Sequence, residues 1–125
     1  MVEIKRAYEL TQPTDGARVL VDRLWPRGLK KQDAHVIQWM RELGPSNELR
    51  HFFGHDPRRW EEFQKRYRSE LRRPEARRML DELARIAQRG RLTLVYSAKD
   101  AEHNQAVVLK ALLDSILGRR NRMDT

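Results

Sequence analysis

The sequence predicts a small α/β domain in which helices pack on a few-stranded mixed sheet, and three observations favour this fold class. Residues 92–96 are almost continuously apolar and β-prone, which is typical of a strand buried on both faces. Two segments before residue 25 also have strand character, and much of the remaining chain carries apolar residues at helical spacing. At 125 residues the chain has the length of one domain, so we expect residues 1–125 to form it.

Two strands are predicted in the N-terminal part, at residues 2–10 and 17–24. The sequence TQPTDG between them is a turn signal of the hairpin kind. Because this link is shorter than the dozen residues of a parallel crossover, we expect antiparallel neighbours or consecutive parts of a bent edge. From Asp33, a plausible N-cap, helical spacing predicts a helix whose apolar face holds Val36, Ile37, Met40 and Leu43.

Capping residues divide the middle of the chain into further helices. Ser46 is the predicted N-cap of a short helix that ends at Gly54. Asp56 and Pro57 then begin a long helix that extends to about Arg73. Its apolar stripe is formed by Trp60, Phe63, Tyr67 and Leu71.

The last part of the chain is predicted to hold two helices around the buried strand. One helix begins at Pro74 and ends at Gly90. After the strand at 92–96, Asp100 is the expected N-cap of the final helix, and residues 117–125 are expected to form a frayed tail.

Composition restricts the classes of function. The chain has no cysteine, which excludes disulfides, thiolate nucleophiles and cysteine-ligated metals. No apolar stretch approaches the ~20 residues of a membrane span, and the N-terminus MVEIKRAYEL carries charges where a signal peptide is apolar. We therefore expect a soluble, cytoplasmic protein without a membrane partner. An exposed edge at the first strand allows a dimer.

Polar clusters end two of the predicted strands. Asp22, Arg23, Trp25 and Arg27 lie at the end of the strand that begins at residue 17, and Ser97, Lys99 and Asp100 follow the strand at 92–96. The largely helical chain between the two strands is long enough for a parallel crossover. The two carboxyl ends can then share one edge of the sheet, which is where ligands bind in open α/β folds.

The chemistry of such a site favours an anion. Arginine and lysine side chains together with unpaired N–H groups at a helix start would bind a phosphate-bearing small molecule or nucleotide, with hydrolase or transferase chemistry as an option. Asp22, Asp100 and His103 are the candidates for acid and base roles, and Asn104 is a further candidate for ligand binding. The structural alternative is that Asp22 and Arg23 form an ion pair, that Trp25 belongs to the core, and that Asp100 only caps a helix.

Weaker patterns leave further alternatives open. His51 and His55 have the spacing of a helical metal pair, but no third ligand is evident, so no metal site is predicted. Ser97 could act as a nucleophile only with a base such as His103 beside it. No Walker loop or GxGxxG motif is present, and no cofactor is predicted.

The charge balance supports an alternative function. Lysine and arginine number 26 against 18 acidic residues, which gives a formal net charge of +8. A nucleic-acid-binding module could use the arginine-rich face of the helix that follows Pro57, although a solvated basic face explains the same pattern. Arg66 and Tyr67 of this helix are candidates for a pocket rim. The basic residues concerned are Arg58, Arg59, Lys65, Arg66, Arg68, Arg72 and Arg73.

Three stretches resemble, in order and spacing, a YeaO-like group of small bacterial proteins within a broader family of domains of unknown function. These are DGARVLVDRLWPRG, ELRHFFGHDPRRWEEFQKRYRSEL and LTLVYSAKDAEHNQAVVLKALL, and the resemblance extends from about residue 3 to residue 117. It implies no activity, because none is established for the family. The residues of the motif blocks are Asp22, Arg23, Trp25, Arg27, Lys99, Asp100 and Asn104.

The resemblance also shows a departure from broader relatives. Those relatives place a cysteine and a CHR-like triplet around the second strand end. This chain has Tyr96 or Ser97 in that region and HNQ at residues 103–105. Any cysteine chemistry of the broader family is therefore excluded here.

Overall fold

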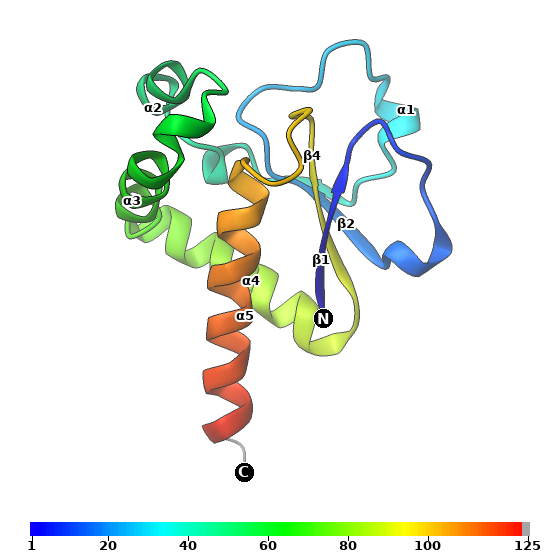
Figure 1. Ribbon diagram of the computed structural model, residues 1–125. Coiled ribbons are helices and arrows are strands. Elements are labelled where there is room, and N and C mark those ends of the chain that lie inside the picture. The colour runs from blue at the N-terminus through cyan, green and yellow to red at the C-terminus, as the bar shows by residue number, and fades with distance from the viewer. Residues whose placement is uncertain (124–125) are drawn as a thin grey trace.

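In the computed structural model, which describes residues 1–123, four strands form one sheet (Figure 1). They are β1 (Val2–Arg6), β2 (Ala17–Leu20), β3 (Gln38–Trp39) and β4 (Leu92–Tyr96), in the order β1-β4-β2-β3. Every pairing is parallel, so the α/β fold class is confirmed while the sheet is parallel throughout rather than mixed. All five residues of β4 are buried, as their continuous apolar character predicts.

The expected pairing of the first two strands is wrong, because β4 lies between them. Val95 is the register partner of Lys5 on one side and of Leu20 on the other. The link at residues 7–16 contains only the short 3₁₀ helix η1 (Pro13–Asp15). Ten extended residues reach about 33 Å, enough to return along a strand of about 17 Å and step across one neighbour at about 10 Å. A crossover without a helix therefore needs fewer residues than expected.

Helices cover one face of the sheet. α4 (Pro74–Arg89) and α5 (Gln105–Met123) pack directly on the strands, and α2 (Asn47–Phe53) and α3 (Trp60–Glu70) extend the same hydrophobic core (Figure 1). A series of rings links α2 to α3, with centroids 4.5 to 5.6 Å apart: Phe53, Phe63, Trp60 and Tyr67. The apolar stripe expected on the long helix is therefore core, as its spacing predicts.

The other face of the sheet is covered by irregular chain. Near the carboxyl ends of the strands, Trp25, Leu29, Val36 and Trp39 pack on a small cluster formed by Ala7, Leu20 and Val95. This covering chain includes α1 (Lys31–Ala34).

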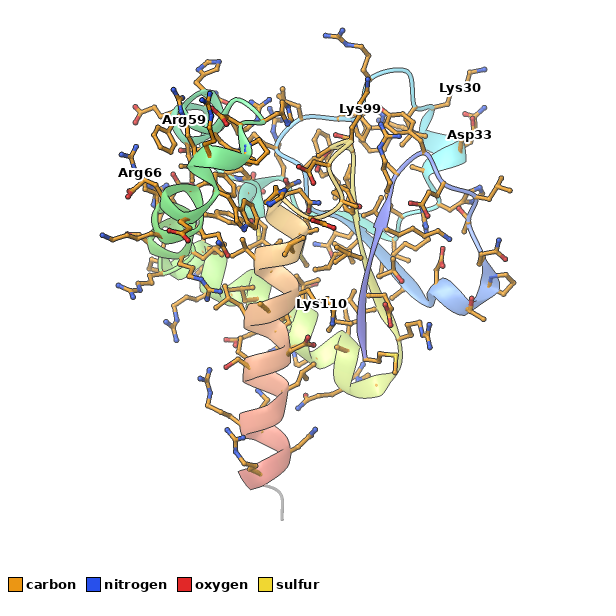
Figure 2. The ribbon with its side chains drawn as sticks, viewed as in Figure 1. Lys30, Asp33, Arg59, Arg66, Lys99 and Lys110 are labelled. Carbon is orange, nitrogen blue, oxygen red and sulfur yellow. The ribbon has the colours of Figure 1, made fainter. Side chains whose placement is uncertain are left out.

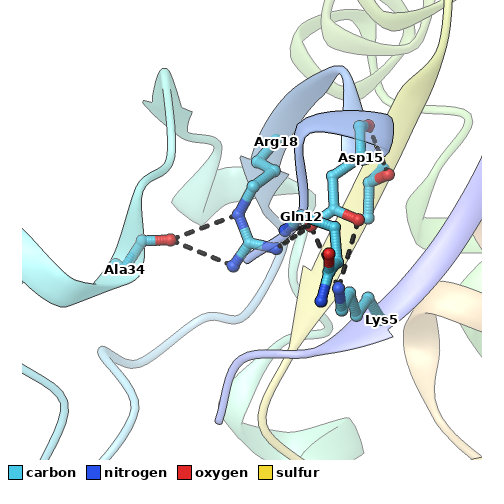
Figure 3. A network of polar contacts seen from close by, with 6 residues as sticks. Lys5, Gln12, Asp15, Arg18 and Ala34 are labelled. Atoms are coloured by element: carbon cyan, nitrogen blue, oxygen red, sulfur yellow. Dashed lines mark hydrogen bonds and ion pairs between the residues drawn. The ribbon is translucent and has the colours of Figure 1, made fainter. Parts of the chain in front are cut away.

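Nearer the amino ends, the same face carries a buried polar network centred on Asp15 (Figure 3). Its carboxylate accepts hydrogen bonds from Lys5 Nζ at 3.1 Å, Arg18 Nη1 at 2.8 Å and the Gln12 N–H at 3.1 Å. Arg18 also donates to the Ala34 carbonyl through Nη2 at 3.0 Å. Burial alone would raise the pKa of Asp15, but these hydrogen bonds and charges outweigh it and lower the pKa.

The helix expected from Asp33 to Leu43 is absent. α1 ends at Ala34, His35 takes a left-handed conformation with φ 51°, and the chain then pairs with β2 as β3. The Ile37 N–H donates to the Arg18 carbonyl at 2.8 Å, and a further bond at 2.9 Å joins Met40 to Leu20. Backbone partners on the edge of β2, together with the Arg18 contact to Ala34, therefore override the helical spacing.

Several expected boundaries are confirmed. Ser46 caps α2 by accepting from the Leu49 N–H, and Gly54 ends it with φ 51°. Asp56 caps the 3₁₀ turn η3 (Pro57–Arg59). One boundary differs from the prediction, since α3 ends at Glu70 rather than at about Arg73. α4 begins at Pro74 and ends before Gly90, and η2 (Arg41–Leu43) is the remaining 3₁₀ turn of the described chain.

The final helix begins and ends later than expected. Asn104, not Asp100, caps α5, because its Oδ1 accepts from the Ala106 N–H at 2.9 Å. α5 continues to Met123, so the tail expected to fray from residue 117 is helical to residue 123, and residues 124–125 lie outside the described residues. Among the described helices, none combines the length and apolarity needed to cross a membrane.

Candidate functional site

The carboxyl ends of β2 and β4 lie side by side and open into a cleft of about 610 Å³. A hydrogen bond from the Val21 N–H to the Val95 carbonyl, 3.0 Å long, continues the pairing beyond β2. The expectation that the two polar clusters share one edge of the sheet is thus confirmed. We call this hollow the strand-end cleft; its lining comprises residues 22–27, Pro45, Arg50, His51, 53–55, Phe63, 97–98 and 103–105.

Asp22 joins three elements at the base of the cleft. It is 6% exposed, and its Oδ2 accepts from the Ser97 N–H at 3.1 Å while its Oδ1 accepts from the Gln105 side chain. Its carbonyl accepts from Trp39 Nε1 at 2.8 Å. Burial raises the pKa of Asp22, and hydrogen bonds from Ser97 and Gln105 offset only part of that rise. The Asp22–Arg23 ion pair of the structural alternative does not form among the described contacts; the carboxylate instead fastens β2 to β4 and α5.

Arg23 lines the cleft but is held by the backbone. Its Nη2 donates to the Gly44 carbonyl at 2.8 Å and its Nε to the Pro45 carbonyl at 3.3 Å. A Cβ on residue 44 would lie 2.5 Å from the backbone nitrogen of Arg23, so this close approach of the two backbones requires glycine at position 44. The guanidinium of Arg23 therefore positions the chain before α2, and its charge adds to the potential of the cleft.

Trp25 and Arg27 form a second part of the wall. Trp25 donates from Nε1 to the Leu29 carbonyl at 2.6 Å and meets the edge of Trp39, with ring centroids 5.4 Å apart. The backbone of Arg27 is held by the Tyr8 hydroxyl, which donates to its carbonyl at 2.7 Å. The Arg27 side chain is exposed, and no described residue forms an ion pair with it. It is available to a ligand.

The wall opposite comes from α2 and the turn after it, and sequence reasoning missed its role. Arg50 donates from Nη1 to Asn47 Oδ1 at 3.1 Å. Its positive charge offsets a small part of the rise that burial causes in the pKa of Asp22. His51 and His55 also line the cleft, and both are exposed. Within the described part of the chain, no group of three potential ligands could hold a metal ion. In the sequence, the one indication of this wall was that these residues lie on either side of Gly54, where a helix was predicted to end.

The loop between β4 and α5 forms the remaining side. Asp100 accepts from the Glu102 and His103 N–H groups and from His103 Nδ1 at 2.8 Å, and these bonds lower the pKa of Asp100. The His103 ring meets Trp60 edge-on, with centroids 5.3 Å apart. Asn104 donates from Nδ2 to the Asp100 carbonyl at 2.9 Å. His103 and Asn104 line the cleft, whereas Asp100 acts mainly through His103.

Besides Asp100, three further candidate residues are not part of the cleft lining. Lys99 is exposed at the tip of the loop after β4 (Figure 2) and is not part of the cleft lining. Tyr67 is fully buried, and its hydroxyl donates to the Leu43 carbonyl. Arg66 lies on the outer side of α3, where Nε pairs with Glu62 at 2.8 Å. The predicted rim formed by Arg66 and Tyr67 is therefore not part of this cleft.

Arginines outnumber carboxylates in the lining of the cleft. Three arginines and three histidines line it, and Asp22 is the one carboxylate among the described lining residues. Both oxygens of Asp22 accept hydrogen bonds from the protein. Apolar surface from Trp25, Pro26 and Phe53 completes the lining. Positive charge beside apolar rings suits an organic anion better than a bare ion.

These features define a class: a small parallel α/β protein with a cleft at the carboxyl ends of its strands. The chain belongs to the DUF488 group, since the model described as the inactive DUF488-N3 subclade matches residues 1–125.

The chain is similar to bacterial proteins that are named as uncharacterized. The chain is 42% identical over 117 residues to the uncharacterized protein YeaO of Escherichia coli strain K12, covering 92% of this chain and 98% of that protein. It is 41% identical over 113 residues to the uncharacterized protein Rv3073c of Mycobacterium tuberculosis strain H37Rv, covering 90% and 93%. The YeaO-like resemblance is thus confirmed. No solved structure is similar enough to count as a match.

Proposed function

We propose that the strand-end cleft binds an organic anion, namely a phosphate-bearing small molecule or a nucleotide. The observation that carries the proposal is the excess of arginine and histidine in the lining over a single, hydrogen-bonded carboxylate. Arginine forks match phosphate oxygens, and each charge-assisted hydrogen bond contributes about 1.5–3 kcal/mol. Arg27, in the loop after β2, and Arg50, on α2, are the lining residues we assign to the anionic group.

The apolar part of the cleft supports an organic body on the anion. Trp25 and Phe53 present aromatic carbon to the same hollow as the arginines. A volume of about 610 Å³ lies within the usual range of roughly 300–1,000 Å³ for small-molecule sites. A nucleoside monophosphate combines a planar ring with a charged end, and it is the simplest ligand of this description.

The proposal is binding without turnover. Asp22 accepts hydrogen bonds from Ser97 and Gln105 that hold the strands and α5 together, so we assign it a structural role. The family description, an inactive subclade, supports the same conclusion. His103 is oriented by Asp100, and we assign it a hydrogen bond to the ligand.

A thermal-shift panel tests the proposal. The parent protein is heated with inorganic phosphate, phenyl phosphate, the four ribonucleoside monophosphates and uncharged nucleosides. A ligand at 100 times its dissociation constant should add about 2.7 kcal/mol of stability, which a melting curve resolves easily. We expect organic phosphates to shift the midpoint more than inorganic phosphate, and nucleosides to shift it little.

Matched variants locate the effect. Arg50→Gln should reduce the shift strongly, whereas Arg85→Gln, which changes an exposed arginine of α4 outside the cleft, should respond like the parent. No shift with any phosphate, or equal shifts in the two variants, would overturn the proposal. Release of inorganic phosphate that depends on His103 would overturn the restriction to binding.

A further inference from the structure

A second cationic surface lies away from the cleft, along α3 and the turn into α4. Lys65, Arg68 and Arg72 are three and four residues apart, so they follow one side of α3 and its C-terminal turn. Arg73 is the N-cap residue of α4 and Arg77 lies in its first turn, where the Arg77 N–H donates to the Arg73 carbonyl at 3.0 Å. We call these five residues the α3–α4 basic stripe. Figure 1 shows α3 and the start of α4 at the edge of the molecule farthest from β1.

The cations of the stripe are not neutralised by the fold. Four of them are exposed and Arg68 is half-buried. Among the described contacts, no ion pair or side-chain hydrogen bond involves any of the five. Glu70, which lies within this segment, instead accepts bonds from the Ser46 N–H and hydroxyl. No ion pair among the described residues neutralises these five cations, and Arg73 shares a small hollow with Glu42, Glu70 and Glu75.

The neighbouring arginines behave differently. Arg58 pairs with Asp56 at 3.1 Å, Arg66 with Glu62 at 2.8 Å, and Arg120 with Asp81 at 3.2 Å. In Figure 2, Arg59 and Arg66 lie on the outer side of α2 and α3. Arg58 and Arg66 are also exposed and Arg120 is half-buried, and each of these three charges is partly balanced by a carboxylate. Arg59 instead donates to the Phe52 carbonyl. Arg78 and Arg85, exposed on α4, also have no ion pair among the described contacts, so the spacing of its cations, not the lack of partners, distinguishes the stripe.

We propose that the α3–α4 basic stripe binds the phosphate backbone of double-stranded nucleic acid without reading its sequence. Lys65 and Arg68 on α3, and Arg73 and Arg77 at the start of α4, are each separated by about one helical turn of 5.4 Å, which suits repeated contacts along a phosphate chain. The large exposed apolar residues of the described chain are Met1, Tyr8, Leu10, Leu24 and Ile37, and all precede residue 38. The stripe thus offers no ring on which unpaired bases could stack and no apolar side chain to enter a bilayer.

Salt dependence gives the proposal a magnitude. Five neutralised phosphates on a duplex predict a slope of log K against log salt of about −4.5. The affinity for a mixed-sequence duplex should then fall about 500-fold between 50 and 200 mM salt. Single strands should bind more weakly and with a shallower slope.

The experiment compares two triple variants with equal charge changes. Fluorescence anisotropy is measured with a labelled 20-base-pair duplex, the matching single strand, and vesicles containing anionic phosphatidylserine. The first triple variant combines Lys65→Gln, Arg72→Gln and Arg77→Gln. It should reduce the magnitude of the salt slope for the duplex by about 2.7. The second triple variant combines Arg58→Gln, Arg66→Gln and Arg120→Gln, and so changes arginines that form ion pairs. Its salt slope should stay close to that of the parent.

Several results would overturn the inference. These are no duplex binding at 50 mM salt, an equal loss of slope in both triple variants, or vesicle binding with the same dependence on the stripe. Melting curves verify that each variant is folded. Should the stripe triple variant fail to fold, the single variant Arg72→Gln must still reduce the slope by about 0.9, and an unchanged slope contradicts the proposal.

Discussion

Replacing Asp15 by asparagine should destabilise the protein more than any surface substitution. Asp15 is the one carboxylate that Lys5 and Arg18 contact among the described residues, and the Arg18 side chain is 3% exposed. An asparagine side chain would retain an amide oxygen but no charge, so the buried guanidinium would lose its ionic partner. Breaking a buried ion pair costs about 3–5 kcal/mol, and the 10% exposure of the Asp15 side chain places the effect near the lower end.

The assay is thermal and urea unfolding of the parent, Asp15→Asn, Arg18→Met and the double variant. A loss of about 3 kcal/mol should lower the melting midpoint by roughly 10 °C. The double variant should be less destabilised than the sum of the singles, with an interaction energy of at least about 1 kcal/mol, because it removes both charges. A loss under about 1 kcal/mol for Asp15→Asn, or additive single effects, would refute the reasoning.

The pH dependence provides a second readout of the same network. The pKa of Asp15 is lowered in the folded state, so its contribution is present above the unfolded value of about 3.9 and is lost as pH falls through the folded pKa. The parent should therefore lose stability in acid more steeply than Asp15→Asn. Parallel acid profiles of the two proteins would show that Asp15 is not responsible.

Three further predictions concern the elements around the cleft. Burial raises the pKa of Asp22, so the folded state holds its proton to higher pH, and stability should fall as pH rises through that pKa. Asp22→Asn should lose this dependence in urea titrations, and an unchanged profile would contradict the assignment. Gly44→Ala should cost at least about 2 kcal/mol in the same assay, because its Cβ would meet the Arg23 backbone; a neutral effect would be inconsistent with that geometry. Tyr67→Phe should cost about 1–2 kcal/mol by leaving the buried Leu43 carbonyl unpaired, and near-parent unfolding would show that the bond is unimportant.

Local signals predicted much of the fold. Ser46, Gly54, Pro74 and Gly90 mark real helix boundaries, because capping and backbone conformation depend on a few neighbouring residues. The continuous apolar character of residues 92–96 correctly indicated a strand buried on both faces.

Segments that depend on distant partners were not predictable in this way. Residues 33–43 have helical spacing, yet the Ile37 N–H bonds to Arg18 and the segment becomes the edge of the sheet. Likewise, the order β1-β4-β2 follows from the position of a strand that comes more than 70 residues after β2. No local pattern encodes that position.

The same distinction between local signals and contacts with distant residues applies to the candidate site. Because β2 and β4 are parallel neighbours, Asp22 and Ser97 come together as their placing at strand ends predicts. Arg50 and His51 enter the cleft through the packing of α2 on α3, which their own sequence does not specify. Tyr67 is a core residue because it continues the apolar stripe of α3.

The most direct test of the central claim is a nuclear magnetic resonance titration of the ¹⁵N-labelled parent with the organic phosphate that shifts the melting curve most. We expect saturable changes concentrated at the amides of Arg27, His51, Ser97 and Gln105, which surround the strand-end cleft. Arg50→Gln should weaken the titration at every one of these positions. No saturable change, or changes confined to residues outside the cleft, would contradict the conclusion that this cleft binds an organic anion.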